Sequence, residues 1–448
     1  MSTFAEHPTV RNFEVKRAEV VARPFRAPLD AAWLRELCLG AGADDAGFVE
    51  IERPEMAPQR DEILNLLPRT QTLISIVCRM NRENIRAPFR SIANVEFHHT
   101  TDQVNEAARK IVAKLEELGI RAVYPTAGFP MEMERFSEGK VFVVSHKPIA
   151  VAAGLGQMGI HRNVIHPRFG SFILLGTVLM DATVTSYSRA IDYNPCLTCK
   201  LCVAACPTGA IGADGAFNFS ACYTHNYREF MGGFNDWVAT IAGSRSIREY
   251  QRNVSAAETA SMWQSLSFGA NYKAAYCLAV CPAGEDVIGP FLTGRKQFLD
   301  EVVKPLQNKS ETVYVVRGSD AEDYVTRRFP KKTIKCVSNG LRVGSINAFL
   351  RGLALNFQRD HSKGVNATYH FTFIGDERRK ATVIIREQTL RVYEGHMGTP
   401  DIRIAADTRS WLRFLAKEKN VVGLLLRRKI RFRGSPRLLL AFGRCFPS

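Results

Sequence analysis

The sequence predicts a multi-domain α+β protein. Its 448 residues exceed what one hydrophobic core usually supports, so two or three packed domains are expected. Strand and helix patterns are interleaved over residues 30–190, whereas cysteine, proline and glycine punctuate residues 191–290. Alternating apolar and polar residues after position 340 predict antiparallel strands. These changes divide the chain into a lead-in (1–29), an α/β domain (30–190), a cysteine-rich domain (191–290), a connecting segment (291–340) and a C-terminal domain (341–448).

The composition is that of a soluble globular protein. Hydrophobic residues make up 46% and charged residues 23% of the chain, which excludes a disordered protein. No apolar stretch is long enough to cross a bilayer. The N-terminus has neither an apolar signal region nor an arginine pair, so a cytoplasmic location is expected. In that reducing compartment, the eleven cysteines favour metal ligands and buried thiols over disulfides.

The first domain begins where the helical pattern begins. Asp30 is the expected N-cap of a helix, AAWLRELCLG, which ends at glycine. TLISIVCRM reads as a buried strand and DQVNEAARKIVAKLEELGI as an amphipathic helix. The segments KVFVVS and FILLGTVLM predict two further strands.

The later elements follow from the same patterns. TVYVVRG, SDAEDYVTRR and KTIKCV predict a strand, a helix capped by Ser319, and a strand. INAFLRGLALNF then predicts a helix, and ATYHFTFIG, ATVIIREQTLRVYEG and DIRIAAD predict antiparallel strands. A helix at TRSWLRFLAKEK, a strand at KIRFR and a helix that begins at Pro436 complete the chain.

The segment CLTCKLCVAACP carries the strongest signal. Its spacing, C-x2-C-x2-C-x3-C-P, is that of an iron–sulfur protein: three thiolates wrap one corner of a cubane, and the fourth points to a second cluster. Cys281 is the only later cysteine that precedes a proline, so the crossed arrangement of two-cluster ferredoxins assigns it to the first cluster. The predicted ligands of cluster 1, a [4Fe–4S] cluster, are Cys196, Cys199, Cys202 and Cys281. The alternative, a structural zinc site, would need only pairs of C-x2-C.

Cluster 2 has an incomplete ligand set. Cys206, Cys222 and Cys277 are its predicted ligands, but Ala274 stands where a fourth cysteine is expected. Three interpretations stay open: a [3Fe–4S] cluster, a [4Fe–4S] cluster with His225, Tyr272 or another group as ligand, and a degenerate site. The remaining cysteines are interpreted as buried thiols: Cys38, Cys78, Cys336 and Cys445.

The stretch AAGLGQMGIHRNVIHPRFGSFILLG, followed directly by the cysteine run, resembles epoxyqueuosine reductase and, more distantly, the reductive dehalogenases. The resemblance covers about residues 30–290. It implies an iron–sulfur-dependent reductase with a nitroreductase-like domain that holds cobalamin and a ferredoxin-like domain with two [4Fe–4S] clusters. It also implies an electron donor of the ferredoxin or flavodoxin type. The residues that match the glycine-rich loop of the family, and are implied to bind the cofactor, are Gly154, Gly156, Gly159, Asn163, Gly170 and Ser171.

The resemblance fails at the expected proton donor. Where the family has a catalytic aspartate, the segment YPTAGFP places Thr126. Glu132 and Glu134 lie close by and are the candidates to replace it, although glutamates in a loop are more often solvated surface.

The same loop also fits the dinucleotide fingerprint G-x-G-x-x-G, with Asp181 at a suitable distance. That fingerprint needs a helix after its last glycine, and Pro167 and Gly170 prevent one. The histidines nearby are predicted to be hydrogen-bonded structural residues rather than ligands: His98, His99, His161 and His166.

Residues 343–446 resemble the sterol carrier protein domain (SCP2-like), a small α+β fold around a lipid-binding tunnel. The resemblance is in the order of strands and helices, from KGVNATYHFTFIG to KIRFRGSPRLLLAF. The side chains expected to line the tunnel are Tyr369, Phe371, Phe373, Trp411 and Phe414; an ordinary packed core is the alternative. The fusion predicts an oxidoreductase with a hydrophobic, lipid- or sterol-like substrate. The alternative functions are a non-catalytic electron carrier and a lipid-binding or lipid-transfer protein.

The formal net charge of +16 lies mostly at the C-terminal end. Residues 340–448 hold 21 Lys and Arg against 8 Asp and Glu. A basic run beside the apolar VVGLLL suits peripheral contact with an anionic membrane, and a solvated face is the alternative. The run consists of Arg427, Arg428, Lys429, Arg431 and Arg433. Because no nucleic-acid recognition module is recognisable, no nucleic-acid partner is expected.

Overall fold

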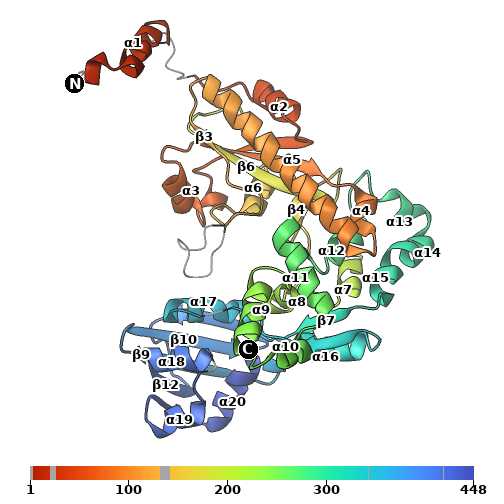
Figure 1. The fold of residues 1–448 in the computed structure, drawn as a ribbon, viewed down its shortest axis with the longest axis vertical. Helices are drawn as coiled ribbons and strands as arrows, with labels where there is room; N and C mark the ends of the chain where they lie inside the picture. Colours follow the sequence, from red (N-terminus) through yellow and green to blue (C-terminus); the bar gives the residue numbers. More distant parts are fainter. Residues whose placement is uncertain (1–3, 21–26, 132–141, 342, 417, 448) are drawn as a thin grey trace.

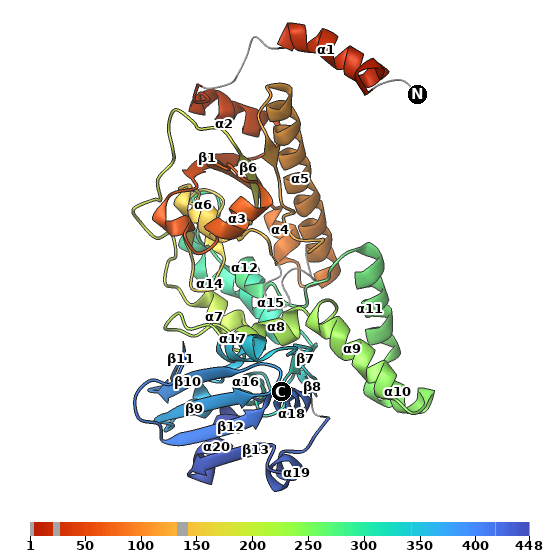
Figure 2. The ribbon, with the colours of Figure 1, turned by 90° about the vertical axis from the view of Figure 1, so that its left-hand side faces the viewer.

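The structure is a computed structural model that describes residues 4–20, 27–131, 142–341, 343–416 and 418–447. Three layers follow one another along the long axis of the molecule (Figure 1). The N-terminal sheet and its helices lie at one end, the cysteine-rich helices in the middle, and the C-terminal sheet at the other end (Figure 2). Helix α1 (Pro8–Val20) lies apart from all three, beyond the N-terminal layer. The predicted multi-domain α+β class is confirmed.

The N-terminal layer is built on a four-stranded sheet with the order β1-β2-β6-β3. The strands are β1 (Asp45–Glu50), β2 (Thr72–Arg79), β6 (Ile173–Met180) and β3 (Ala122–Val123), and every neighbouring pair is antiparallel. The helices around it are α2 (Ala31–Gly40), α3 (Arg60–Leu66), α4 (Arg82–Arg86), α5 (Arg90–Glu117) and α6 (His146–Ala152).

Strand β2 is buried on both faces. Ile74 and Ile76 belong to the core shared with α2 and α5, whereas Leu73 and Val77 belong to the core shared with α3 and α6. Successive strand side chains point to opposite faces, so a sheet covered on both sides needs a continuous apolar run rather than an alternating one. This explains the sequence TLISIVCRM.

Two of the predicted elements in this layer have opposite outcomes. The cap of α2 is confirmed, because the Asp30 carboxylate accepts a 2.7 Å hydrogen bond from the Trp33 backbone N–H. The strand predicted at KVFVVS is wrong for its described part, residues 142–145, which have no strand pairing and lead directly into α6. The edge of the sheet beside β6 is occupied by β3 instead.

The middle layer holds the cysteines on short helices and loops. Helices α7 (Leu201–Ala205), α8 (Phe219–Asn226) and α12 (Tyr276–Ala279) meet there. The predicted strand–helix–strand unit is confirmed as β7 (Thr312–Val315), α16 (Asp320–Arg328) and β8 (Thr333–Cys336). Its strands are parallel, and its apolar residues belong to the same core as those of α7 and α12. The connection after β8 reaches the C-terminal layer.

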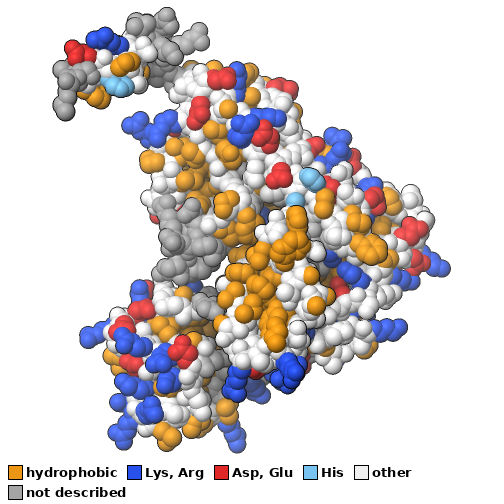
Figure 3. Space-filling model, in the orientation of Figure 1, with side chains coloured by type: hydrophobic (Ala, Val, Ile, Leu, Met, Phe, Trp, Pro, Cys, Tyr) orange, Lys and Arg blue, Asp and Glu red, His pale blue; other side chains and the backbone are white. Residues whose placement is uncertain are grey.

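A helical excursion separates α8 from α12 and was not anticipated by the sequence patterns. It consists of α9 (Gly232–Gly243), α10 (Ile247–Asn253) and α11 (Ala256–Phe268). Large apolar side chains cover one exposed face of it, which Figure 3 shows as a continuous hydrophobic area. The exposed residues include Val238, Ile241, Trp263, Leu266 and Phe268.

The C-terminal layer is a five-stranded sheet with the order β11-β10-β9-β12-β13. The strands are β9 (Ala367–Ile374), β10 (Arg379–Arg386), β11 (Thr389–Glu394), β12 (Ile402–Asp407) and β13 (Ile430–Gly434). The segment ATVIIREQTLRVYEG forms two strands, and β12 pairs with β9 in parallel, so the expectation of antiparallel strands alone is wrong. Its helices are α17 (Ile346–Asn356), α18 (Thr408–Leu415), α19 (Val421–Leu426) and α20 (Pro436–Cys445).

Candidate iron–sulfur site

The cysteine run forms a turning loop followed by a short helix rather than one straight helix. Thr198 and Lys200 both have positive φ angles, 53° and 61°, so the backbone turns between successive cysteines. Cys202 then lies on α7, and Cys206 is the C-cap of that helix. Left-handed residues are costly outside glycine, and their occurrence twice in three positions shows that the fold holds this loop in a specific shape.

The four predicted ligands of cluster 1 line one pocket. Cys196, Cys199 and Cys202 come from the run, and Cys281 comes from the segment just after α12. The other lining residues are Ile160, His161, Leu197, Lys200, Pro282 and Ala283. The fold therefore brings together four thiols that are separated by up to 85 positions in the sequence.

The thiolate forms of these cysteines are electrostatically unfavourable without a metal. Burial, together with the charges of the neighbouring cysteines, raises the pKa of the Cys202 thiol to about 12. Burial likewise raises the pKa of Cys281 to about 11, although hydrogen bonds from Ala283 and Ser171 oppose the increase. Iron binds thiolates, so a cation at this point would supply the charge that deprotonation needs.

The cysteines form no disulfides, because all eleven are free thiols. Over the described part of the chain, no group of three or more His, Cys, Asp or Glu side chains forms a site for one metal ion. The zinc alternative would need four ligands that converge on one ion.

Cys206, Cys222 and Cys277 form a second group of thiols. Burial, and to a smaller extent the charge of Cys206, raises the pKa of Cys222 to about 12. Burial also raises the pKa of Cys277, and the charges of Cys222 and Cys206 add to it. Asn163 contacts this group, because its Nδ2 lies 3.9 Å from the Cys277 sulfur.

Neither side chain named as a fourth ligand of cluster 2 faces these three thiols. The Nδ1 atom of His225 accepts a 3.3 Å hydrogen bond from the Tyr314 backbone N–H, and its electrostatic neighbours are Glu311 and three lysines. Tyr272 is surrounded by rings, with Phe97, Tyr227 and Phe230 within 5.7 Å between centroids. At position 274, the backbone N–H donates to the Asn226 side chain over 2.8 Å.

His161 has a buried ring nitrogen without a hydrogen-bond partner, a feature that it shares with His225 but not with His166 or His98. His166 bonds to the Asp45 carboxylate over 3.0 Å, and His98 bonds to the Ala270 carbonyl oxygen over 3.0 Å, as expected of structural residues. His161 accepts a 3.2 Å hydrogen bond at Nδ1 from the Asn163 backbone N–H, but its buried Nε2 has no partner. Burial, and to a smaller extent the charge of Lys147, lowers the pKa of His161 to about 4.

The tautomer of His161 follows from these contacts. Because Nδ1 accepts a hydrogen bond, the neutral ring carries its proton on Nε2. His161 is 3% exposed and lines the pocket of the cluster 1 cysteines. A buried N–H donor without an acceptor is costly, and cluster sulfur is an acceptor of suitable chemistry. The residues present therefore fit an iron–sulfur cluster in this pocket.

The glycine-rich loop packs against protein backbone. A Cβ on Gly170 would lie 1.9 Å from the Ala283 carbonyl oxygen, and one on Gly154 would lie 2.3 Å from the Arg189 carbonyl oxygen. Ser171 is buried and donates a 3.2 Å hydrogen bond to the Leu278 carbonyl oxygen. Gly170 and Ser171 thus support the segment that carries Cys281.

The other glycines of the loop are similarly enclosed. A Cβ on Gly156 would lie 2.4 Å from the Ile165 carbonyl oxygen, and one on Gly159 would lie 2.7 Å from the Ile165 side chain. The short hairpin of β4 (Gln157–Met158) and β5 (Val164–Ile165) takes the place of the helix that a dinucleotide fingerprint requires. These contacts supply no open cradle for a corrinoid at the four glycines.

The catalytic candidates Glu132 and Glu134 lie outside the described residues. Thr126 is described, and its hydroxyl donates to the Phe129 carbonyl oxygen over 2.7 Å. A titratable group in contact with Thr126 is His146, whose Nε2 bonds to the Thr126 carbonyl oxygen over 3.1 Å. Its Nδ1 bonds to Thr177 over 2.8 Å. Burial lowers the pKa of His146. The sequence patterns gave no signal for His146.

The predicted tunnel residues form an aromatic cluster. Phe371 stacks on Phe373 at 5.8 Å, and Trp411 lies edge-on to both at 5.8 Å. Tyr369 joins the cluster through Phe442, and Phe414 joins it through Trp411. Within this packed set, the buried Trp411 Nε1 has no hydrogen-bond partner. The basic run lies at the end of α19 and along β13, beside the exposed Leu426.

The comparisons with known proteins agree with both halves of the resemblance. Residues 346–447 match the model of the SCP-2 sterol transfer family. The C-terminal layer is an SCP2 domain. Upstream of it, the chain is similar to epoxyqueuosine reductases: it is 32% identical to that of Cellulophaga algicola over 112 residues, which cover 22% of this chain and 36% of the relative. The chain thus matches about a third of the length of its curated relatives.

The similar solved structures are likewise epoxyqueuosine reductases and reductive dehalogenases. A crystal structure of an epoxyqueuosine reductase with an epoxyqueuosine-modified tRNA stem loop has a TM-score of 0.32 at 18% identity, over 43% of this chain and 56% of that one. A catabolic reductive dehalogenase has a TM-score of 0.37 at 15% identity, over 61% of this chain and 34% of that one.

The expectation of no nucleic-acid partner was wrong. It rested on the lack of a recognisable recognition module, yet the similar solved structure named above is that of an epoxyqueuosine reductase with a tRNA stem loop. No described helix combines the length and hydrophobicity of a transmembrane span.

Proposed function

We propose that this protein is an iron–sulfur-dependent reductase in which two clusters of the cysteine-rich layer pass single electrons to a centre in the N-terminal layer. The observation that carries the proposal is the single pocket lined by Cys196, Cys199, Cys202 and Cys281, with the unpartnered His161 N–H beside it. The second thiol group shares α7 and α12 with the first, which supports a two-step path for electrons.

The residues that would hold cluster 1 are those four cysteines, and cluster 2 would be held by Cys206, Cys222 and Cys277. The clusters would supply single-electron transfer when bound. The chain itself buries Cys202, Cys206 and Cys281 and half-buries the other four thiols. Ser171 and Gly170 fix the Cys281 segment. Cobalamin is the electron acceptor that the resemblance implies. The four glycines of the loop pack against protein atoms and leave no open surface for it, so the proposal includes no reaction step on cobalamin.

The substrate class follows from the SCP2 domain. We assign a hydrophobic, lipid- or sterol-like ligand to the helix-covered face of its sheet, because the unpartnered Trp411 N–H is a buried donor that a polar atom of such a ligand would satisfy. An RNA substrate, as for the relative named above, is the competing class, and the net charge of +16 favours it.

A non-catalytic role is the second candidate. Thr126 at the position of the expected aspartate favours it, since a hydroxyl bonded to the Phe129 carbonyl oxygen is a poor proton donor. An electron carrier or a lipid-transfer protein would need the clusters or the SCP2 domain but no proton donor.

Anaerobic purification followed by mass spectrometry and a reductase assay distinguishes these functions. The proposal predicts bound iron and sulfide, a co-purified lipid, and oxidation of reduced clusters when the substrate class is added. Clusters that stay reduced with lipid, sterol and tRNA stem loops alike would favour the electron carrier. A protein that binds no iron would contradict the proposed function.

A further inference from the structure

The second group of thiols has three of the four ligands that a four-iron cluster needs. Neither His225 nor Tyr272 supplies the fourth. Ala274 has no donor atom in its side chain, and its backbone N–H is used by Asn226. His225 turns toward β7, and Tyr272 is enclosed by aromatic rings. Cys206, Cys222 and Cys277 therefore stand together as three thiols.

An ammonium group lies beside these thiols. Lys147, on α6 of the N-terminal layer, donates to the Arg162 carbonyl oxygen over 2.7 Å and to the Asn163 side-chain oxygen over 3.0 Å. Desolvation lowers the pKa of Lys147. The charges of Cys277 and Cys222 act on the same ammonium and oppose this decrease. Asn163 links the two groups, since its Nδ2 approaches the Cys277 sulfur.

Lys147 has the capacity to bind an anion. An ammonium has three N–H donors, and two of them are used in the contacts just described. Part of the Lys147 residue is exposed to solvent, while the protein around its ammonium desolvates the charge. Two hydrogen bonds to neighbouring oxygens hold the charge in place, which lowers the entropy cost of binding a ligand there.

A four-iron cluster with three cysteine ligands has one iron without a protein ligand. Such an iron takes an oxygen or sulfur ligand from solution, and a fixed cation beside it favours a negatively charged one. We propose that cluster 2 is a four-iron cluster with three cysteine ligands, and that its remaining iron binds a small carboxylate or thiolate that Lys147 holds by an ion pair. This inference rests on the proposed function, because it requires that the clusters form.

The test uses the full chain, reconstituted anaerobically with iron and sulfide, reduced, and followed by electron paramagnetic resonance. Thioglycolate is the probe because it carries both a thiolate for iron and a carboxylate for Lys147. The comparison ligand, 2-mercaptoethanol, has the thiol but no carboxylate. We expect thioglycolate to shift the cluster 2 signal of the wild type at lower concentration than 2-mercaptoethanol.

Three variants separate the contributions. Ala274→Cys supplies the fourth protein ligand, so thioglycolate should no longer change the cluster 2 signal. Lys147→Gln removes the charge, and the apparent Kd of thioglycolate should rise about tenfold or more, as for loss of one charged hydrogen bond. The Kd of 2-mercaptoethanol should rise less, because this ligand has no carboxylate for Lys147. Lys114→Gln is the matched control, because Lys114 pairs with Glu117 on α5 rather than with the cysteines.

Several outcomes would overturn the inference while leaving the proposed function intact. In each, the cluster 1 signal is present. They are a wild-type cluster 2 signal that ignores thioglycolate, a three-iron signal that added ferrous iron does not convert, and an Ala274→Cys variant that responds as the wild type does. Loss of both cluster signals from the wild type would instead contradict the proposed function and the inference together.

Discussion

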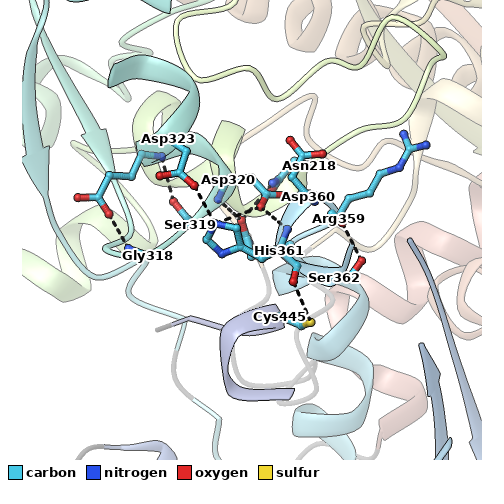
Figure 4. Close-up of polar contacts among 12 residues, drawn as sticks. Asn218, Gly318, Ser319, Asp320, Asp323, Arg359, Asp360, His361, Ser362 and Cys445 are labelled. Carbon is cyan, nitrogen blue, oxygen red and sulfur yellow. Dashed lines mark hydrogen bonds and ion pairs between the residues drawn. The ribbon is translucent and has the colours of Figure 1, made fainter. Parts of the chain in front are cut away.

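His361 in the SCP2 domain bonds to Asp323 in the connecting unit, with 2.9 Å between Nε2 and Oδ2 (Figure 4). The bond joins the 3-10 helix Asp360–Ser362 to α16. Asp320 reinforces it, because its carboxylate accepts the backbone N–H groups of Asp360 and His361 over 2.9 and 3.1 Å. This contact holds the C-terminal layer against the middle layer.

The contact between the two layers should weaken as pH rises. Desolvation lowers the pKa of His361, but the hydrogen bond to Asp323 and the charge of Asp320 outweigh it, so the pKa lies above the ordinary 6.5. A histidine with a raised pKa stabilises the folded state fully below its unfolded pKa, and this stabilisation is lost as pH rises through the folded value. The group is partly exposed, so the change should stay under about 1 kcal/mol.

Limited proteolysis between β8 and α17 as a function of pH measures this effect. Cleavage should be slowest near pH 6 and faster above the raised pKa. The raised pKa of Asp320, caused by its burial, acts at lower pH and so does not interfere in this window. His361→Gln should flatten the dependence; an unchanged profile in that variant would assign it to another group.

Gly170→Ala should impair cluster 1 rather than only the fold. Its φ of +64° is unfavourable for alanine, and the new Cβ would lie 1.9 Å from the Ala283 carbonyl oxygen, next to the Cys281 segment. Iron content should fall after reconstitution. Gly119→Ala is the control, because Gly119 also has a positive φ, +78°, but nothing within 4 Å of a Cβ. Equal iron content in both variants would mean that the approach of Gly170 does not matter.

His161→Phe should lower the reduction potential of cluster 1. A hydrogen bond to cluster sulfur stabilises the extra electron, and phenylalanine keeps the ring while removing the donor. His161→Gln keeps an N–H donor and should restore part of the potential. A redox titration followed by electron paramagnetic resonance measures both. If His161→Phe titrates at the wild-type potential, the Nε2–H does not reach the cluster.

Phe371→Ala separates a packed core from a ligand tunnel. Phe371 is fully buried and contacts Phe349, Phe373, Trp411 and Phe442. If the ring belongs to a packed core, the substitution should lower the free energy of unfolding of the SCP2 domain by about 3–5 kcal/mol. Thermal unfolding measured with and without added lipid checks this. A small loss of stability with a large loss of lipid binding would identify Phe371 as part of a tunnel wall.

The cysteine grouping could be predicted from the sequence because ligand spacing is a local property. Cys196, Cys199 and Cys202 lie within seven positions, and the proline after Cys281 marks the returning ligand. Membership of one pocket in the structure agrees with that assignment. The predicted buried strand TLISIVCRM succeeded for a similar reason, since a sheet covered on both faces leaves a continuous apolar run.

The missed features depend on contacts between distant segments. Lys147 is linked to Cys277 through Asn163, which accepts a hydrogen bond from the lysine and approaches the cysteine sulfur. The free Nε2 of His161 is equally a tertiary property, and its sequence context resembles that of the fully bonded His166. Strand direction was also hidden: the alternation in DIRIAAD is the same whether β12 pairs in parallel or antiparallel with β9.

The central claim is that two clusters of unequal ligation occupy the cysteine-rich layer. The most direct measurement is electron paramagnetic resonance of the reduced, reconstituted wild type beside Cys281→Ser. The account predicts two cluster signals in the wild type and selective loss of the cluster 1 signal in the variant. Two unchanged signals in Cys281→Ser, or no cluster signal in the wild type, would contradict it.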